Sequence, residues 1–205
     1  MRSDDVLYRP IRFVDNLQGN NHIVLLYDDQ KYADLIIARY ILNGLQKGES
    51  CIFFTADDPQ ETERRLADAG IDVESYLRKN SLRVFCIQKS DENKRDVIQT
   101  LRGIRDQATQ GMAPPYRFVG RTITDTASVA GMELGLTVEK TGHENFDDFD
   151  CSQLCYYDVS GIEPSRRQEW IARLLKNHHH VIFASGPERA VAFETMLLEP
   201  DEEEE

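Results

Sequence analysis

The chain has 205 residues, of which 40% are hydrophobic and 29% are charged. These fractions are typical of one soluble globular domain with a buried core, and they exclude collagen-like, wholly disordered and disulfide-stapled chains. The formal net charge of −12 disfavours direct binding to DNA or RNA, because an acidic surface repels phosphates.

The termini and the cysteines indicate the cellular compartment. No stretch approaches the roughly 20 apolar residues that a membrane span needs, and the first ten residues lack the apolar segment of a secretory signal. Four cysteines are too few for a disulfide framework. We therefore expect a reduced, cytoplasmic protein with no membrane segment. It would comprise an N-terminal arm or hairpin over 1–21, an α/β domain over 22–198 and an acidic disordered tail over 199–205.

Short apolar runs alternate with longer helical patterns along the chain. The runs are apolar on consecutive positions, which is typical of strands buried on both faces. The predicted strands cover 22–27, 51–55, 82–87, 116–119, 153–157 and 180–184. Alternation of strands and helices implies right-handed crossovers. The predicted fold class is therefore α/β with three layers, in which a mostly parallel central sheet carries helices on both faces.

Helices are predicted between these strands. The first, over 31–46, is apolar nearly all round and should be largely buried, with Gly44 and Gly48 at its end. Asp58 and Pro59 have the N-cap and first-position chemistry that begins a second helix. The remaining helices are expected over 97–108, over 129–140 and from Pro164 onward.

The loop after the first predicted strand is the place where an open parallel sheet binds its ligand. A P-loop would show Gly-x-x-x-x-Gly-Lys-Ser/Thr there, with backbone amides around the phosphates. This chain reads Tyr27-Asp-Asp-Gln-Lys-Tyr-Ala-Asp34, without glycine, and the carboxylates of Asp28 and Asp29 would repel a triphosphate. We therefore predict no catalysis, ATP hydrolysis included, and no cofactor.

Several segments resemble known families. The run from Tyr40 to Thr55 is similar to the helix, turn and second strand of RecA/KaiC-type ATPases. Four segments resemble, in order, motifs of the MEDS domain, a DcmR-like sensory domain taken to be a RecA-like relative without the nucleotide loop. They are His-Ile-Val-Leu-Leu-Tyr (22–27), Arg-Phe-Val-Gly-Arg (117–121), Leu-Cys-Tyr-Tyr-Asp (154–158) and His-His-Val-Ile (179–182). Arg121 departs from the usual Glu, and His180 from the usual Pro. The resemblance implies a RecA/KaiC-like fold without a Walker A loop, and a sensory role.

The resemblance and the position of the strand ends together suggest a ligand site. Lys31 and Arg121 would pair with an anion, Tyr27 and Tyr32 would line an apolar wall, and Asp158 would hold a donor. The alternative for Asp158 is a cap on the turn that follows it. The expected ligand-binding residues are Tyr27, Asp28, Lys31, Tyr32, Thr55, Gly120, Arg121 and Asp158.

Cysteine and histidine residues are weaker candidates for a metal centre. Zinc needs four ligands around one point, and neither Cys151 with Cys155 nor the run 178–180 has a second ligand pair at a supporting spacing. The spacing therefore favours no metal, with the cysteines as small buried residues. His22 would act as a ligand or pH sensor, or would bond a neighbouring carbonyl, and the last interpretation is favoured.

The leading hypothesis is a non-catalytic sensory and regulatory domain that binds a small ligand or protein partner at the carboxyl ends of the strands. An anion is among the expected ligands, and the expected partner is a regulatory protein, either a kinase or a transcription regulator. Assembly into a homo-oligomer is left open. The alternatives are a RecA/KaiC-like ATPase with an atypical loop, and a degenerate scaffold subunit of an oligomeric assembly.

Overall fold

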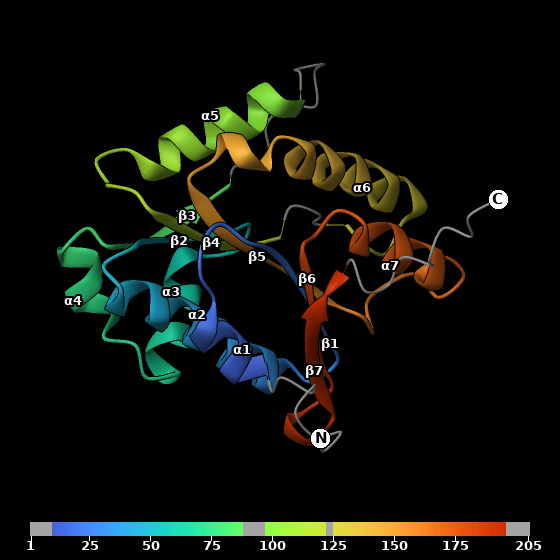
Figure 1. Ribbon diagram of the computed structural model, residues 1–205, viewed down its shortest axis with the longest axis horizontal. Helices are drawn as coiled ribbons and strands as arrows, with labels where there is room; N and C mark the ends of the chain where they lie inside the picture. Colours follow the sequence, from blue (N-terminus) through green and yellow to red (C-terminus); the bar gives the residue numbers. More distant parts are fainter. Residues whose placement is uncertain (1–9, 88–96, 122–124, 196–205) are drawn as a thin grey trace.

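A seven-stranded sheet forms the centre of the structure, with the strand order β3-β2-β4-β5-β1-β6-β7 (Figure 1). The structure, a computed structural model, describes residues 10–87, 97–121 and 125–195. Adjacent strands from β3 to β6 are parallel, and β7 pairs antiparallel with β6 at the edge. The strands are β1 (His22–Tyr27), β2 (Ser50–Thr55), β3 (Leu82–Cys86), β4 (Tyr116–Gly120), β5 (Cys151–Asp158), β6 (His180–Ala184) and β7 (Ala190–Glu194).

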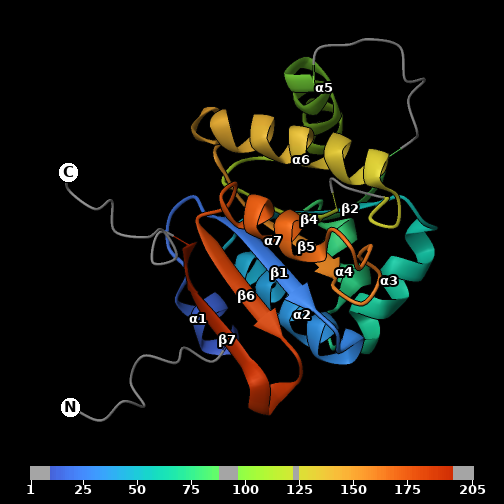
Figure 2. The same ribbon diagram turned by 90° about the vertical axis from the view of Figure 1, so that its right-hand side faces the viewer.

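Two layers of helices cover the sheet, which confirms the predicted three-layer α/β fold (Figures 1 and 2). The helices on one face are α1 (Pro10–Asn16), α2 (Gln30–Gln46), α3 (Pro59–Asp68) and α4 (Val73–Arg78). Those on the other face are α5 (Val97–Thr109), α6 (Val129–Glu144) and α7 (Arg167–Leu175). None of the helices in the described ranges is long and apolar enough to cross a membrane.

The strands are buried on both faces, as their consecutive apolar residues predict. All six residues of β1 are buried. On β5 the side chains alternate: Tyr156 packs in the core on the α2 side, whereas Cys155 and Tyr157 pack in the core under α6 and α7. Neighbouring residues of one strand therefore belong to two separate environments.

Helix α2 follows its predicted bounds closely, but one of its glycines has a different role. Gly48 follows the helix end with a φ of +81°, as expected. Gly44 was expected there too and lies inside the helix, so that prediction was wrong. An added Cβ on Gly44 would lie 2.6 Å from Cδ of Arg117. This glycine makes room for the buried Arg117 side chain, which pairs with Glu49 at 2.6 Å.

Some elements were not expected from the sequence. Residues 10–16 of the expected arm or hairpin form α1, and α4 and β7 are additional. The helix expected from Pro164 begins at Arg167, after a turn in which the side chain of Glu163 accepts a hydrogen bond from the Ser165 amide at 3.0 Å. The acidic tail over 199–205 lies outside the described residues.

Candidate functional site

The carboxyl ends of β1, β2, β4 and β5 lie at one edge of the sheet, the C-terminal edge. Tyr27 stands opposite Asp158 in the register of β1 and β5. Arg121 directly follows β4, and its guanidinium carbon lies 5.5 Å from the ring centre of Tyr156 on β5. Parallel pairing therefore collects aromatic, acidic and basic side chains from several strands at this edge.

Two tyrosines form the apolar floor of the C-terminal edge. Tyr27 and Tyr156 are 4% and 6% exposed, and their ring centres are 6.5 Å apart. Burial, reinforced by the neighbouring Asp158, raises the pKa of Tyr27 to about 12. Burial also raises the pKa of Tyr156. Both phenols are therefore neutral near neutral pH, so they offer a ring face and a hydroxyl but no base.

Two arginines lie near enough to Tyr156 to affect its pKa. The positive charges of Arg121 and Arg65 both oppose the rise in the pKa of Tyr156. Arg121 forms a loose ion pair with Asp57 at 3.6 Å, in which the side chains are 39% and 70% exposed. Arg65 on α3 pairs closely with Asp34 on α2. The pair of Arg121 is the weaker one, because it is long and open to solvent.

The carboxylate of Asp29 lies at the N-terminus of α2 and caps the helix. The side chain of Asp29 accepts a hydrogen bond from the Tyr32 amide at 3.0 Å. A P-loop would place a phosphate at such a helix start, where free amides and the helix dipole favour negative charge. The carboxylate of Asp29 occupies that position instead, so the loop is capped internally.

The predicted ligand-binding residues differ in exposure and in their bonds. Thr55 accepts a hydrogen bond from the Asp57 amide at 3.0 Å. Asp158 accepts bonds from the Ser160 amide and hydroxyl at 2.8 and 2.6 Å, as a turn cap does. Their ligand-binding role stays a prediction. Buried are Tyr27, Tyr32, Thr55 and Gly120; half-buried are Arg121 and Asp158; exposed are Asp28 and Lys31.

Gly120 has a packing role at this edge. A Cβ there would lie 2.8 Å from Cβ of Phe54 on the neighbouring strand. Close contact between β2 and β4 therefore accounts for this glycine without a bound ligand.

Comparison with known sequences shows the family of the chain. The profile of the MEDS family (methanogen/methylotroph, DcmR sensory domain) matches residues 21–179. The chain belongs to the MEDS family. Its membership supports a sensory or regulatory role for this MEDS domain. No match was found among curated proteins.

Solved structures share the fold of this MEDS domain. A KaiC-like protein of the hyperthermophilic archaeon Pyrococcus horikoshii OT3 superposes with a TM-score of 0.63 at 13% identity, over 87% of this chain and 80% of that one. A second protein of the same organism gives a TM-score of 0.59 at 12% identity, over 90% of this chain and 91% of that one. At these identities the likeness shows a KaiC-like fold and no shared chemistry.

Three residues of the C-terminal edge were missed from the sequence. Tyr156 lies two residues before Asp158, so alternation along β5 places it on the same face and would have found it. Arg65 and Asp34 required the packing of α3 on α2, which the sequence does not reveal. A small hollow opens between these two helices, lined by Asp34, Ile37, Phe53, Thr62, Arg65 and Leu66.

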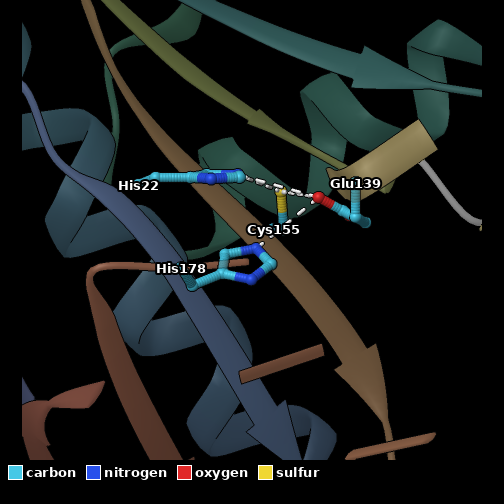
Figure 3. Close-up of side chains that lie close together, drawn as sticks. All are labelled: His22, Glu139, Cys155 and His178. Atoms are coloured by element: carbon cyan, nitrogen blue, oxygen red, sulfur yellow. Dashed lines mark hydrogen bonds and ion pairs between the residues drawn. The ribbon is translucent and has the colours of Figure 1, made fainter. Parts of the chain in front are cut away.

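The cysteine and histidine candidates separate in the structure of the MEDS domain. Cys155 and His178 meet at the opposite end of the sheet, together with His22 and Glu139 (Figure 3). Cys151 packs in a different core cluster, beneath α5. Glu139 was missed because it lies on α6, a helix with three glycines whose inner face was not assigned from the sequence.

Proposed function

We propose that this MEDS domain is a sensory module that recognises a small anionic ligand at its C-terminal edge and does not hydrolyse nucleotides. The observation that carries the proposal is the capping of α2 by Asp29. A triphosphate at this helix start would have to displace a carboxylate already bonded to the helix amides. Ligand recognition is therefore expected beside the loop, at Arg121.

Arg121 supports an anion site because its present partner is easily replaced. The ion pair with Asp57 is 3.6 Å long and largely exposed, so it contributes little stability. A ligand carboxylate or phosphate would form a charge-assisted hydrogen bond with the guanidinium. The apolar part of such a ligand would lie against Tyr156 and Tyr27.

A signal would follow from the release of Asp57. This residue donates its backbone amide to Thr55 and directly precedes Asp58, which caps α3. Displacement of the Asp57 side chain would change the loop that begins α3. A regulatory partner, a kinase or a transcription regulator, would respond to the shifted population of this loop.

Calorimetric titration with small carboxylates, inorganic phosphate and ATP with Mg²⁺ tests the proposal. Arg121→Gln should abolish anion binding, and Asp57→Asn should strengthen it. The matched control is Arg173→Gln, because Arg173 is similarly exposed and pairs with Glu133 on the other face of the sheet.

Two outcomes would contradict the proposal. ATP binding that requires Mg²⁺ and disappears in Asp158→Ala would favour the ATPase alternative. Anion binding that is equal in wild type and Arg121→Gln would remove the site from the C-terminal edge. Mass photometry in the same series addresses the scaffold alternative, for which an oligomer without anion binding is expected.

A further inference from the structure

Four side chains with metal-ligand atoms converge between β1, β5, α6 and the segment before β6 (Figure 3). One ligand atom from each of His22, Glu139, Cys155 and His178 lies within 4.8 Å of the other three. We propose that these four residues bind a single Zn²⁺ ion. This inference is independent of the anion site, which lies at the other end of the sheet.

The distances within the cluster fit a tetrahedral ion. Nε2 of His22 lies 3.6 Å from Sγ of Cys155 and 3.7 Å from Oε2 of Glu139. Nε2 of His178 lies 3.6 Å from the same oxygen, and Sγ of Cys155 lies 3.9 Å from it. Zinc bonds of about 2.0 Å to nitrogen and about 2.3 Å to sulfur place tetrahedral ligand atoms roughly 3.3–3.6 Å apart. For these four pairs a contraction of a few tenths of an ångström reaches the tetrahedral distances, and the remaining two pairs lie within 4.8 Å.

His178 is oriented as a ligand. Its Nδ1 lies 2.9 Å from the carbonyl oxygen of Leu174, to which it donates, so that Nε2 carries the lone pair. Its side chain is fully buried, and Nε2 has no hydrogen-bond partner within the described part of the chain. A buried polar atom without such a partner is costly. A metal ion at the cluster centre would satisfy it.

The other three ligands also have partners that orient them. The hydroxyl of Tyr157 donates to Oε1 of Glu139, which leaves Oε2 toward the cluster. The amide of Gln153 donates to Sγ of Cys155 at 3.1 Å. Nδ1 of His22 lies 3.4 Å from Nδ1 of His143, so its Nε2 points inward. Such outer contacts are typical of metal sites, where they hold the ligating tautomer and rotamer.

Charge balance favours a divalent cation. His22 and His178, whose side chains are 2% and 0% exposed, would bind the ion as neutral imidazoles. The ligating forms of Glu139 and Cys155 carry one negative charge each. A divalent ion makes the buried site neutral, which avoids the cost of uncompensated charge in the core.

The ligand set selects zinc among divalent ions. Calcium and magnesium prefer oxygen ligands alone, whereas imidazole and thiolate suit zinc. Blue copper centres share two histidines and a cysteine but have a long axial ligand. Here the carboxylate oxygen lies 3.7 Å from Nε2 of His22, about as close as the sulfur at 3.6 Å, and 3.6 Å from Nε2 of His178. Four protein ligands with no open position indicate a structural ion that joins α6 and the segment before β6 to the sheet.

Elemental analysis of the full chain, purified from zinc-supplemented culture, tests the proposal. One zinc per chain is expected, and X-ray absorption should show one sulfur and three nitrogen or oxygen neighbours. Refolding with Co²⁺ should produce tetrahedral visible bands and a thiolate charge-transfer band. Cys155→Ser should remove that band, and His178→Gln should lower metal content. The matched controls are Cys151→Ser, which changes a buried cysteine outside the cluster, and Arg121→Gln. Both should keep the metal.

Three results would overturn the inference. The first is a chain that refolds cooperatively without metal, takes up neither Zn²⁺ nor Co²⁺, and melts at the same temperature with and without zinc. In that case the cluster would be a hydrogen-bond network only. The second is equal metal content in wild type and both ligand variants. The third is copper or iron as the bound metal. X-ray absorption on the wild type identifies the ligand atoms even if a variant fails to fold.

Discussion

Replacing Asp29 with alanine removes the carboxylate that caps α2 and empties the position that a P-loop would give to phosphate. Loss of an Asp N-cap costs about 1 kcal/mol. For a chain of this size, ~1 kcal/mol lowers the melting temperature by about 2–4 °C. The vacated helix start keeps its amides and its dipole, and the first turn of α2 contains no acidic residue. Sulfate or phosphate should therefore bind there.

The size of the anion effect follows from mass action. An anion at about ten times its dissociation constant stabilises the folded state by about 1.4 kcal/mol, which offsets the lost cap. Thermal unfolding followed by circular dichroism, in chloride and in sulfate at equal ionic strength, measures both effects. Asp58→Ala is the matched control, because Asp58 caps α3 through the Gln60 amide at 3.0 Å. Pro59 and Glu61 in that first turn remove a donor and repel anions.

The result for Asp29→Ala that would refute this reasoning is specific. If it melts at the wild-type temperature in chloride, the carboxylate contributes nothing to the helix. If Asp29→Ala and Asp58→Ala gain equally from sulfate, the start of α2 has no special affinity for anions, and its resemblance to a phosphate site fails.

Three further changes test the packing and the titration behaviour of the domain. Gly44→Ala places a Cβ 2.6 Å from Cδ of Arg117, so the free energy of unfolding in urea should fall by about 1–3 kcal/mol; an unchanged value would mean that Arg117 moves freely. Glu49→Ala leaves the Arg117 guanidinium, with 3% of its side chain exposed, without its carboxylate, and should cost about 3 kcal/mol; a loss near zero in the same assay would contradict a buried pair. Burial lowers the pKa of His180 below 6.5, so the unfolded chain binds more protons below that pH and stability falls on acidification. His180→Gln should make this fall shallower in a pH series of melting temperatures, and an unchanged slope would contradict it.

The strands were predictable because the signal for a strand buried on both faces is local. The predicted bounds of β1 match the observed ones, and every residue of that strand is buried. Strand β7 was not found, because a short edge strand with one buried residue, Ala192, lacks such a run. The role of Gly44 was misread because it depends on Arg117 on β4, a residue 73 positions away along the chain.

The two candidate sites were predictable to different degrees. The rule that ligands bind at the carboxyl ends of parallel strands was enough to bring Tyr27, Arg121 and Asp158 to one edge. His22, Cys155 and His178 were each noticed, but their convergence depends on the order β5-β1-β6. Strand order is a property of long-range pairing, and no spacing in the sequence reports it. Glu139 additionally requires α6 to lie over these strands.

The energetics of the fold explain how a KaiC-like scaffold can exist without a phosphate-binding loop. Strand β1 is stabilised by pairing with β5 and β6 and by burial under helices on both faces. Burial of one large apolar side chain contributes about 1.5–3 kcal/mol, whereas the loop after β1 contributes the single N-cap of Asp29. Loss of the phosphate-binding loop therefore leaves nearly all of the folding free energy in place. A shared fold at 13% identity consequently reports the packing of the strands and carries no inference about hydrolysis, which depends on the loop and on other polar groups at the strand ends.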